Sequence, residues 1–184
     1  MSKATTPNLA WMDAAIGFLG AAEIGSTNSS PLIDSWVCEL SGTKKVPTYL
    51  KNQPWCGTFV AKCLKSAGLT KAKVSNGSGG NEYPLHWYRA ADYRSLKKQL
   101  AEPAWGCVAV KKRTGGNHVF FVVGKNKAGK IVGIGGNQSN KVCYALFEPK
   151  ELEYFWYGKT NSPGQQRFEL PIITNVTATK VSEA

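Results

Sequence analysis

The sequence predicts an α+β fold in which N-terminal helices pack on a C-terminal antiparallel β-sheet of about five strands. Apolar residues recur at helical spacing up to Pro103 and alternate in short runs after it. The 184 residues are enough to bury one core. We therefore expect a single domain over residues 1–173, followed by a flexible polar tail over residues 174–184.

Three amphipathic helices are expected in the N-terminal part, over residues 9–23, 31–40 and 56–67. Ser29 or Ser30 is the expected N-cap of the second helix, because a serine hydroxyl accepts free backbone N–H groups of a first turn. Gly68 is the expected end of the third helix, whose apolar residues fall on one face.

The middle of the chain leads from the helices to the sheet. Residues 71–84 are rich in Gly, Ser and Asn and predict a long loop, and residues 85–93 (LHWYRAADY) predict an aromatic helix. The expected strands are residues 105–110, 118–124, 130–136, 141–147 and 153–158. The segment GKNKAGK, between the second and third of these, is typical of a hairpin turn.

The chain is strongly basic, with 23 Lys and Arg against 12 Asp and Glu and a net charge of +11. Such an excess favours a polyanionic partner, namely nucleic acid, an anionic membrane surface or a bacterial cell wall, and solubility alone is the plainer interpretation. The lysines are dispersed and no RNA-binding signature occurs, so DNA or RNA is not the expected partner.

No apolar run reaches the length of a membrane span, so no membrane insertion is expected. Asp13 interrupts the N-terminal apolar stretch, which is typical of an amphipathic helix rather than a signal peptide. The five cysteines are odd in number and include no CxxC pair. This pattern predicts neither a disulfide framework nor a zinc site, and no metal or cofactor is expected.

Cys56 lies in NQPWCGTFV, at the first turn of the third predicted helix. Free N–H groups there stabilise a thiolate and can hold an oxyanion, and we expect Gly57 to leave room for substrate beside the sulfur. Packing is the competing interpretation, because free cysteine is among the most buried residue types. The remaining cysteines lie in apolar patterns and are expected in the core: Cys38, Cys63, Cys107 and Cys143.

A nucleophilic cysteine needs a base, and the chain has two histidines. His118 opens a predicted strand, and Asn137 follows on the next strand across the hairpin, so the two side chains can lie side by side. Asn137 would then fix the ring tautomer and leave the other nitrogen for the thiol of Cys56. The order Cys, His, Asn is typical of cysteine proteases. His86 lies among aromatic residues, where packing or stacking on substrate is expected.

Three segments carry a resemblance to a known family: PWCGTFVAKCLKSAGL, GNHVFFVVG and GIGGNQSNKV. Over about residues 10 to 158 the chain resembles the CHAP and NlpC-like cysteine peptidoglycan hydrolases, a branch of the papain-like architecture. The resemblance implies Cys56 as the nucleophile, His118 as the general base and acid, and Asn137 as the residue that orients the histidine. Many relatives carry an acidic residue at or near the third position, and Gln138 is the alternative to Asn137 here.

Other residues are weaker candidates. Gln53, three residues before the cysteine, is a candidate for polarising the substrate carbonyl. Trp55, His86 and Trp87 are candidates for a substrate groove.

The resemblance implies hydrolysis of an amide bond in peptidoglycan, as an amidase or endopeptidase, through an acyl-enzyme. The protein would be made in the bacterial cytoplasm without a signal peptide. It would act in the periplasm or cell wall, as an antibacterial effector exported by a secretion apparatus or as a phage lysin. An effector would imply a cognate immunity protein. Two alternatives stay open: a non-catalytic wall- or nucleic-acid-binding module, and a papain-like protein deamidase or transglutaminase.

Overall fold

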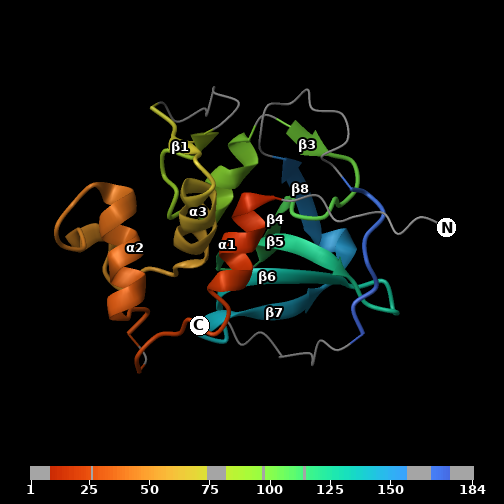
Figure 1. Cartoon of the computed structure of the whole chain (residues 1–184), viewed down its shortest axis with the longest axis horizontal. Helices are drawn as coiled ribbons and strands as arrows, with labels where there is room; N and C mark the ends of the chain where they lie inside the picture. The colour runs from red at the N-terminus through yellow and green to blue at the C-terminus, as the bar shows by residue number, and fades with distance from the viewer. Residues whose placement is uncertain are drawn as a thin grey trace.

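A computed structural model of the chain describes residues 9–25, 27–73, 82–96, 98–113, 115–156 and 167–174. Within these residues the fold is α+β, as predicted: helices accompany a six-stranded antiparallel sheet and a small two-stranded parallel sheet. Figure 1 shows the helices gathered on one side of the larger sheet. None of the described helices has the length and apolar character needed to cross a membrane.

The α-helices of the described residues are α1 (Ala10–Gly17), α2 (Pro31–Ser41) and α3 (Cys56–Ser66). Ser30 is the N-cap of α2, since its hydroxyl accepts the Ile33 N–H at 3.3 Å. The first helix is shorter than predicted. The chain turns at Gly20, with φ 86°, and the Gly20 N–H donates to the Val142 carbonyl at 2.9 Å. The segment after α1 therefore pairs with the sheet edge instead of extending the helix.

The sheet contains β3 (Lys98–Leu100), β4 (Val108–Arg113), β5 (Gly116–Lys125), β6 (Ile131–Gln138), β7 (Lys141–Phe147) and β8 (Leu152–Trp156). Its order is β3-β8-β4-β5-β6-β7, and every neighbouring pair is antiparallel. All five predicted strands form, and residues 157–158 of the last predicted strand lie outside the described residues. The additional strand, β3, pairs only with β8 and has three residues, too few to show an alternating pattern.

The turns agree in part with the prediction. The β5–β6 hairpin closes where the Asn126 N–H donates to the Lys130 carbonyl at 2.9 Å. The small sheet pairs β1 (Thr70–Lys71) with β2 (Glu82–Tyr83), at the two ends of the predicted 71–84 loop. Residues 74–81 of that loop and residues 175–184 of the predicted tail lie outside the described residues.

The predicted helix over residues 85–93 does not form. A turn at residues 85–88 leads into the 3₁₀ helix η2 (Ala90–Ser95). The Trp87 carbonyl accepts the Tyr93 hydroxyl at 3.0 Å, and the same backbone lies against Gly57, where an added Cβ would come within 2.6 Å of the Trp87 oxygen. These tertiary contacts override the local helical pattern. The other 3₁₀ helices are η1 (Thr48–Leu50) and η3 (Pro149–Glu151).

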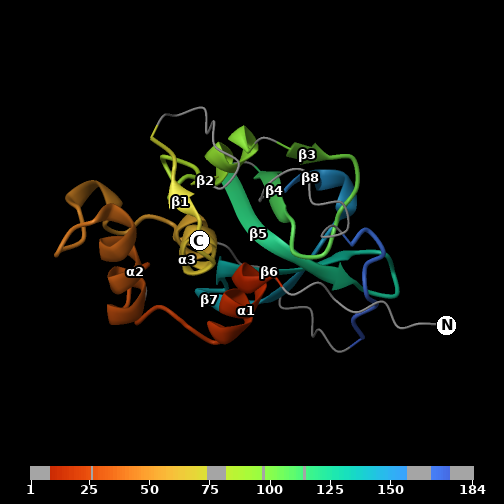
Figure 2. The ribbon, with the colours of Figure 1, turned by 45° about the horizontal axis from the view of Figure 1, so that its top comes forward.

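Helix α3 is the centre of the core. Its apolar face is buried against β5 and β6, and Phe59 meets Phe121 edge to face with ring centroids 6.2 Å apart. Helix α1 packs beside α3, and Figure 2 shows α3 lying between α2 and the larger sheet. Helix α3, including its N-terminus, is therefore held between these helices and the strands β5 and β6.

Tyr93 joins η2 to the start of α3. Its buried hydroxyl lies 2.7 Å from the Gly57 carbonyl and 3.0 Å from the Trp87 carbonyl. We expect Tyr93→Phe to lower the free energy of unfolding, measured by urea denaturation, by about 1–2 kcal/mol, because these buried carbonyls lose a donor. Tyr154→Phe is the matched control, since its hydroxyl makes one long bond of 3.4 Å, and a smaller loss is expected there. Equal losses would contradict the anchoring role of Tyr93.

Candidate active site

Cys56 is the first residue of α3, and its thiol lies in the wall of a cleft of about 420 Å³. The cleft is formed by three chain segments: the one before α3 (Tyr49, Gln53 and Pro54), residues 88–90, and residues 115–117 at the start of β5. Because Cys56 occupies the first helical turn, backbone N–H groups of that turn lack helical partners and are available to the sulfur. The predicted helix start is therefore confirmed, and it faces an open cleft.

The pKa of Cys56 is lowered from its ordinary value. Burial disfavours the thiolate, but a hydrogen bond and the charge of His118, together with backbone hydrogen bonds from Val119 and Gly57, outweigh it. Three other cysteines show the contrast: burial raises the pKa of Cys63, Cys107 and Cys143. The lowered pKa thus comes from the surroundings of Cys56, since Cys63 and Cys107 are buried as well. Cys38 and Cys143, which were also expected in the core, are only partly buried.

His118 lies on β5 with 1% of its surface exposed. Its ring stacks on Phe120 and on Phe147, with centroid distances of 5.7 and 5.9 Å, which fixes the ring plane. His118 Nε2 lies 3.0 Å from Gln138 Oε1. An amide oxygen only accepts, so Nε2 carries the hydrogen and Nδ1 is left with a lone pair for the Cys56 thiol.

The orientation of the Gln138 amide is also fixed. Its Nε2 donates to the Cys143 carbonyl at 2.5 Å, and the Cys143 thiol donates to the Gln138 carbonyl at 3.2 Å. A carbonyl oxygen offers no hydrogen, so the amide nitrogen must face Cys143 and the amide oxygen must face His118. The chain Gln138–His118–Cys56 can therefore take the thiol proton onto the imidazole and stabilise the resulting imidazolium.

The side chain that contacts and orients His118 is that of Gln138, the alternative candidate, and not that of Asn137. The β5–β6 register pairs Phe121 with Ile134. If this register continued for three more residues, Asn137 would lie opposite His118. A β-bulge intervenes in β6: between the Gly135–Cys143 and Gln138–Lys141 pairs, two residues of β6 oppose one of β7. Asn137 takes a left-handed φ of 55°, and its buried Oδ1 has no hydrogen-bond partner among the described residues.

Two glycines make this geometry possible: Gly135, directly before the bulge, and Gly136, within it. An added Cβ on Gly135 would lie 2.7 Å from Gln138 Oε1, and one on Gly136 would lie 2.5 Å from Phe59 Cβ and 2.6 Å from the Trp55 ring. Gly135 thus lets the Gln138 side chain fold back over its own strand. Gly136 lets α3 approach the sheet closely.

The room expected beside Gly57 is not open to substrate. The backbone of Trp87 and Tyr88 fills it, with Tyr88 carbonyl atoms 2.9 Å from where a Cβ would stand. The glycine is required here so that the 87–88 turn can pack on the first turn of α3.

The three residues predicted to form a substrate groove differ in burial, and none of them lines the cleft that contains Cys56. Trp55 is buried, its indole N–H donates to Glu23 at 2.7 Å, and it lines a cavity beside the cleft. Trp87 is buried and does not line the cleft. His86 is partly exposed, also outside the cleft lining, and its Nδ1 lies 2.9 Å from Asp92 Oδ2. Of the weaker candidates, Gln53 lines the cleft with Cys56.

Sequence reasoning missed other residues of the cleft lining. Asn117 directly precedes His118, and its Oδ1 accepts a hydrogen bond from Arg94 at 2.8 Å. Tyr49 lies in η1 and Arg89 directly precedes η2, so the two are far apart in the sequence. Only the position of Asn117 beside the histidine offered a signal in the sequence.

Comparison with protein-family models, with curated proteins and with solved structures found no match to this chain. Among the described residues, no group of three or more His, Cys, Asp or Glu side chains could hold a metal ion.

The lowered pKa of Cys56 predicts how its reactivity depends on pH. Because His118 and the N–H groups favour the thiolate, we expect the rate of alkylation by iodoacetamide to stay high below pH 9.0, the ordinary cysteine value, and to fall only below the lowered pKa. In His118→Ala, the hydrogen bond and charge that favour the thiolate are lost, so burial raises the pKa of Cys56. The pH midpoint of alkylation should therefore shift upward. Peptide mapping by mass spectrometry across pH measures both rates, with Cys63 as the unreactive internal control. A wild-type midpoint at or above 9.0 would contradict this assignment.

The bulge predicts that Gln138 and Asn137 differ in their effect on the thiol. Gln138→Met removes the acceptor that stabilises the imidazolium, so the alkylation midpoint of Cys56 should rise. Asn137→Gly, which tolerates the positive φ, should leave the midpoint unchanged. Near-ultraviolet circular dichroism controls for folding of both variants. A larger rise in Asn137→Gly than in Gln138→Met would return the orienting role to Asn137.

Proposed function

We propose that the protein is a cysteine hydrolase that cleaves an amide bond in bacterial peptidoglycan. One observation carries the proposal: a thiol of lowered pKa at a helix start opens on a cleft, and it is hydrogen-bonded to a buried histidine whose far nitrogen is held by an amide oxygen. This is the arrangement that nucleophilic attack by a cysteine on a carbonyl requires.

The Cys56 thiolate attacks the carbonyl carbon and forms a tetrahedral intermediate. Its oxyanion is held by N–H groups of the first turn of α3 and by the amide of Gln53. The imidazolium of His118 then gives its proton to the departing amine, which leaves an acyl-enzyme. A water molecule, deprotonated by His118, releases the acyl group and restores the thiol.

The choice of substrate rests on the resemblance to the CHAP and NlpC-like hydrolases. The order of the cysteine helix, the histidine strand and the following strand supports membership of that family and a papain-like architecture. Gln138 takes the third role in place of Asn137. The net charge of +11 supports association with an anionic cell wall.

The biological setting is part of the same proposal. The protein acts in the periplasm or wall of a target bacterium, as an exported antibacterial effector or as a phage lysin. As an effector it has a cognate immunity protein that occupies the Cys56 cleft in the producing cell.

Digestion of purified sacculi tests the proposal. Wild-type protein should release soluble fragments whose masses, determined by mass spectrometry, identify the amide bond that is cut. Cys56→Ala should reduce the release at least about 10³-fold, because the covalent step is lost. Cys38→Ala is the matched control, since it removes a thiol outside the cleft, and it should retain activity.

Other outcomes would favour the alternatives. Intact sacculi with salt-sensitive binding that Cys56→Ala does not change would favour a binding module. Intact sacculi together with Cys56-dependent deamidation of glutamine in proteins would favour a deamidase.

A further inference from the structure

The backbone ladder between β6 and β7 is interrupted beside Gln138. It is regular up to the Gly135–Cys143 pair and resumes at the Gln138–Lys141 pair, so regular pairing is lost across the bulge. Two side-chain hydrogen bonds cross this interruption. The Gln138 amide donates to the Cys143 carbonyl at 2.5 Å, and the Cys143 thiol donates to the Gln138 carbonyl at 3.2 Å. Each residue thus binds the backbone of the other with its own side chain.

The Cys143 thiol binds the backbone of Gln138, and that backbone determines where the Gln138 amide oxygen lies. Gln138 is fully buried, and its side chain folds over Gly135 to place Oε1 3.0 Å from His118 Nε2. A small rotation of the Gln138 backbone would take this oxygen out of hydrogen-bond geometry, because hydrogen bonds weaken steeply as their angle departs from linear. The thiol therefore constrains the residue that orients the base.

The state and place of the Cys143 thiol suit a donor that acts within the protein. Burial raises its pKa above the ordinary cysteine value, so the sulfur keeps its hydrogen at neutral pH. Cys143 lies on β7 and is not among the residues that line the Cys56 cleft. We therefore expect its thiol to act on the base and not on the substrate.

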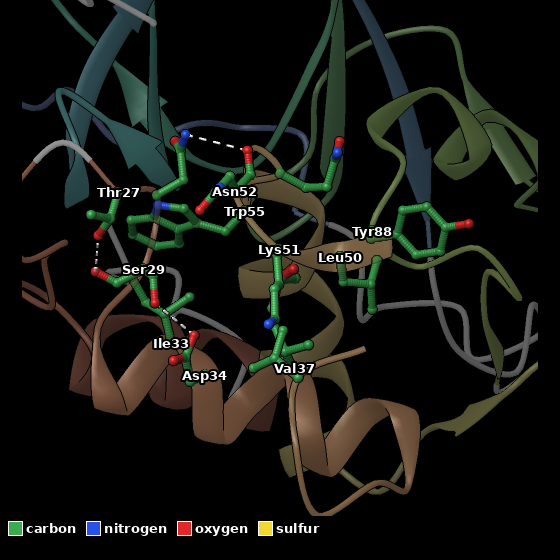
Figure 3. A pocket seen from close by; sticks show the side chains of 14 residues that line it. Thr27, Ser29, Ile33, Asp34, Val37, Leu50, Lys51, Asn52, Trp55 and Tyr88 are labelled. Atoms are coloured by element: carbon green, nitrogen blue, oxygen red, sulfur yellow. Dashed lines mark hydrogen bonds between the residues drawn. The ribbon is translucent and has the colours of Figure 1, made fainter. Parts of the chain in front are cut away.

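The tip of the β6–β7 hairpin is held from outside. Val142 forms two backbone hydrogen bonds with the turn at residues 20–21, at 2.7 and 2.9 Å, and the Glu23 N–H donates to the Asn140 carbonyl at 3.0 Å. The Glu23 carboxylate accepts the Trp55 indole N–H, and Trp55 also lines a second cavity, which lies between α2 and the segment that leads to α3 (Figure 3). None of these bonds reaches the bulge, so they do not replace the bonds between Cys143 and Gln138.

We propose that Cys143 is a positioning residue for the catalytic base. Its thiol holds the Gln138 carbonyl, and this keeps the Gln138 amide oxygen on His118 Nε2 and leaves Nδ1 free to face Cys56. Without the thiol, Gln138 contacts His118 for a smaller fraction of the time, and the imidazolium loses part of its stabilisation. The inference rests on the proposed Cys56–His118 chemistry, and it adds a residue outside the cleft on which the base depends.

Two substitutions at Cys143 test this role through the pH dependence of Cys56 alkylation. Cys143→Ala removes the donor, so the midpoint should rise by about 0.5 pH unit, the indirect effect of one weak hydrogen bond. Cys143→Ser keeps a donor, and its midpoint should lie closer to that of the wild type than to that of Cys143→Ala. An unchanged midpoint in Cys143→Ala would overturn the proposal. Equal rises in both variants would also overturn it, because lost packing would then be the cause.

The tautomer of His118 gives a second readout, by NMR of the imidazole nitrogens with His86 as the internal reference. The wild type should carry its hydrogen on Nε2, and Cys143→Ala should show a measurable fraction of the other tautomer. Cys38→Ala is the matched control, since it removes another partly buried thiol, on α2, and both readouts should stay at their wild-type values. A wild-type tautomer in Cys143→Ala would overturn the route through Gln138.

Digestion of sacculi separates this inference from the proposed hydrolysis. A raised midpoint in Cys143→Ala, without release of fragments by the wild type, would support the positioning role and contradict the hydrolysis. Release by the wild type, with an unchanged midpoint in Cys143→Ala, would overturn the positioning role and leave the hydrolysis standing. Neither release nor a raised midpoint would overturn both.

Discussion

The β-bulge at Gly136 and Asn137 is the constraint on which the rest of the site depends. By adding one residue to β6, it changes which side chain faces His118 on the neighbouring strand. Gln138 then holds the histidine nitrogen that points away from the sulfur, and its own amide is held by the Cys143 carbonyl. The tautomer of the base is thus determined by the backbone geometry of β6, the strand next to the one that carries His118.

The nucleophile depends on the same region through packing. Without a side chain, Gly136 permits Trp55 and Phe59 of the α3 region to contact the sheet, and that contact sets the distance between helix start and histidine strand. Burial alone would make Cys56 a poor nucleophile, as it does for Cys63. A buried thiol becomes acidic only where hydrogen-bond donors and a cation compensate for lost hydration, which requires sub-ångström placement of elements from different parts of the chain.

Much of this architecture could be predicted from local sequence. The helix start at Cys56, the Ser30 cap and the five strands follow from patterns within a few residues. The bulge could not be predicted, because residues 135–140 (GGNQSN) contain no large apolar side chain whose alternation would reveal an inserted residue. The turn at residues 85–88 was missed for a related reason: its backbone is held by Gly57 and Tyr93, which are distant in sequence.

The segment from Asn52 to Cys56 links the two cavities. Gln53 lies at the junction, Trp55 is bound to Glu23, and Glu23 in turn holds the loop that forms the wall of the second cavity. The wall of the second cavity and the start of α3 are therefore held by one set of contacts, because Glu23 binds both Asn28 and Trp55. Loss of the Glu23 carboxylate should alter the position of the Cys56 thiol as well as that of the cavity wall.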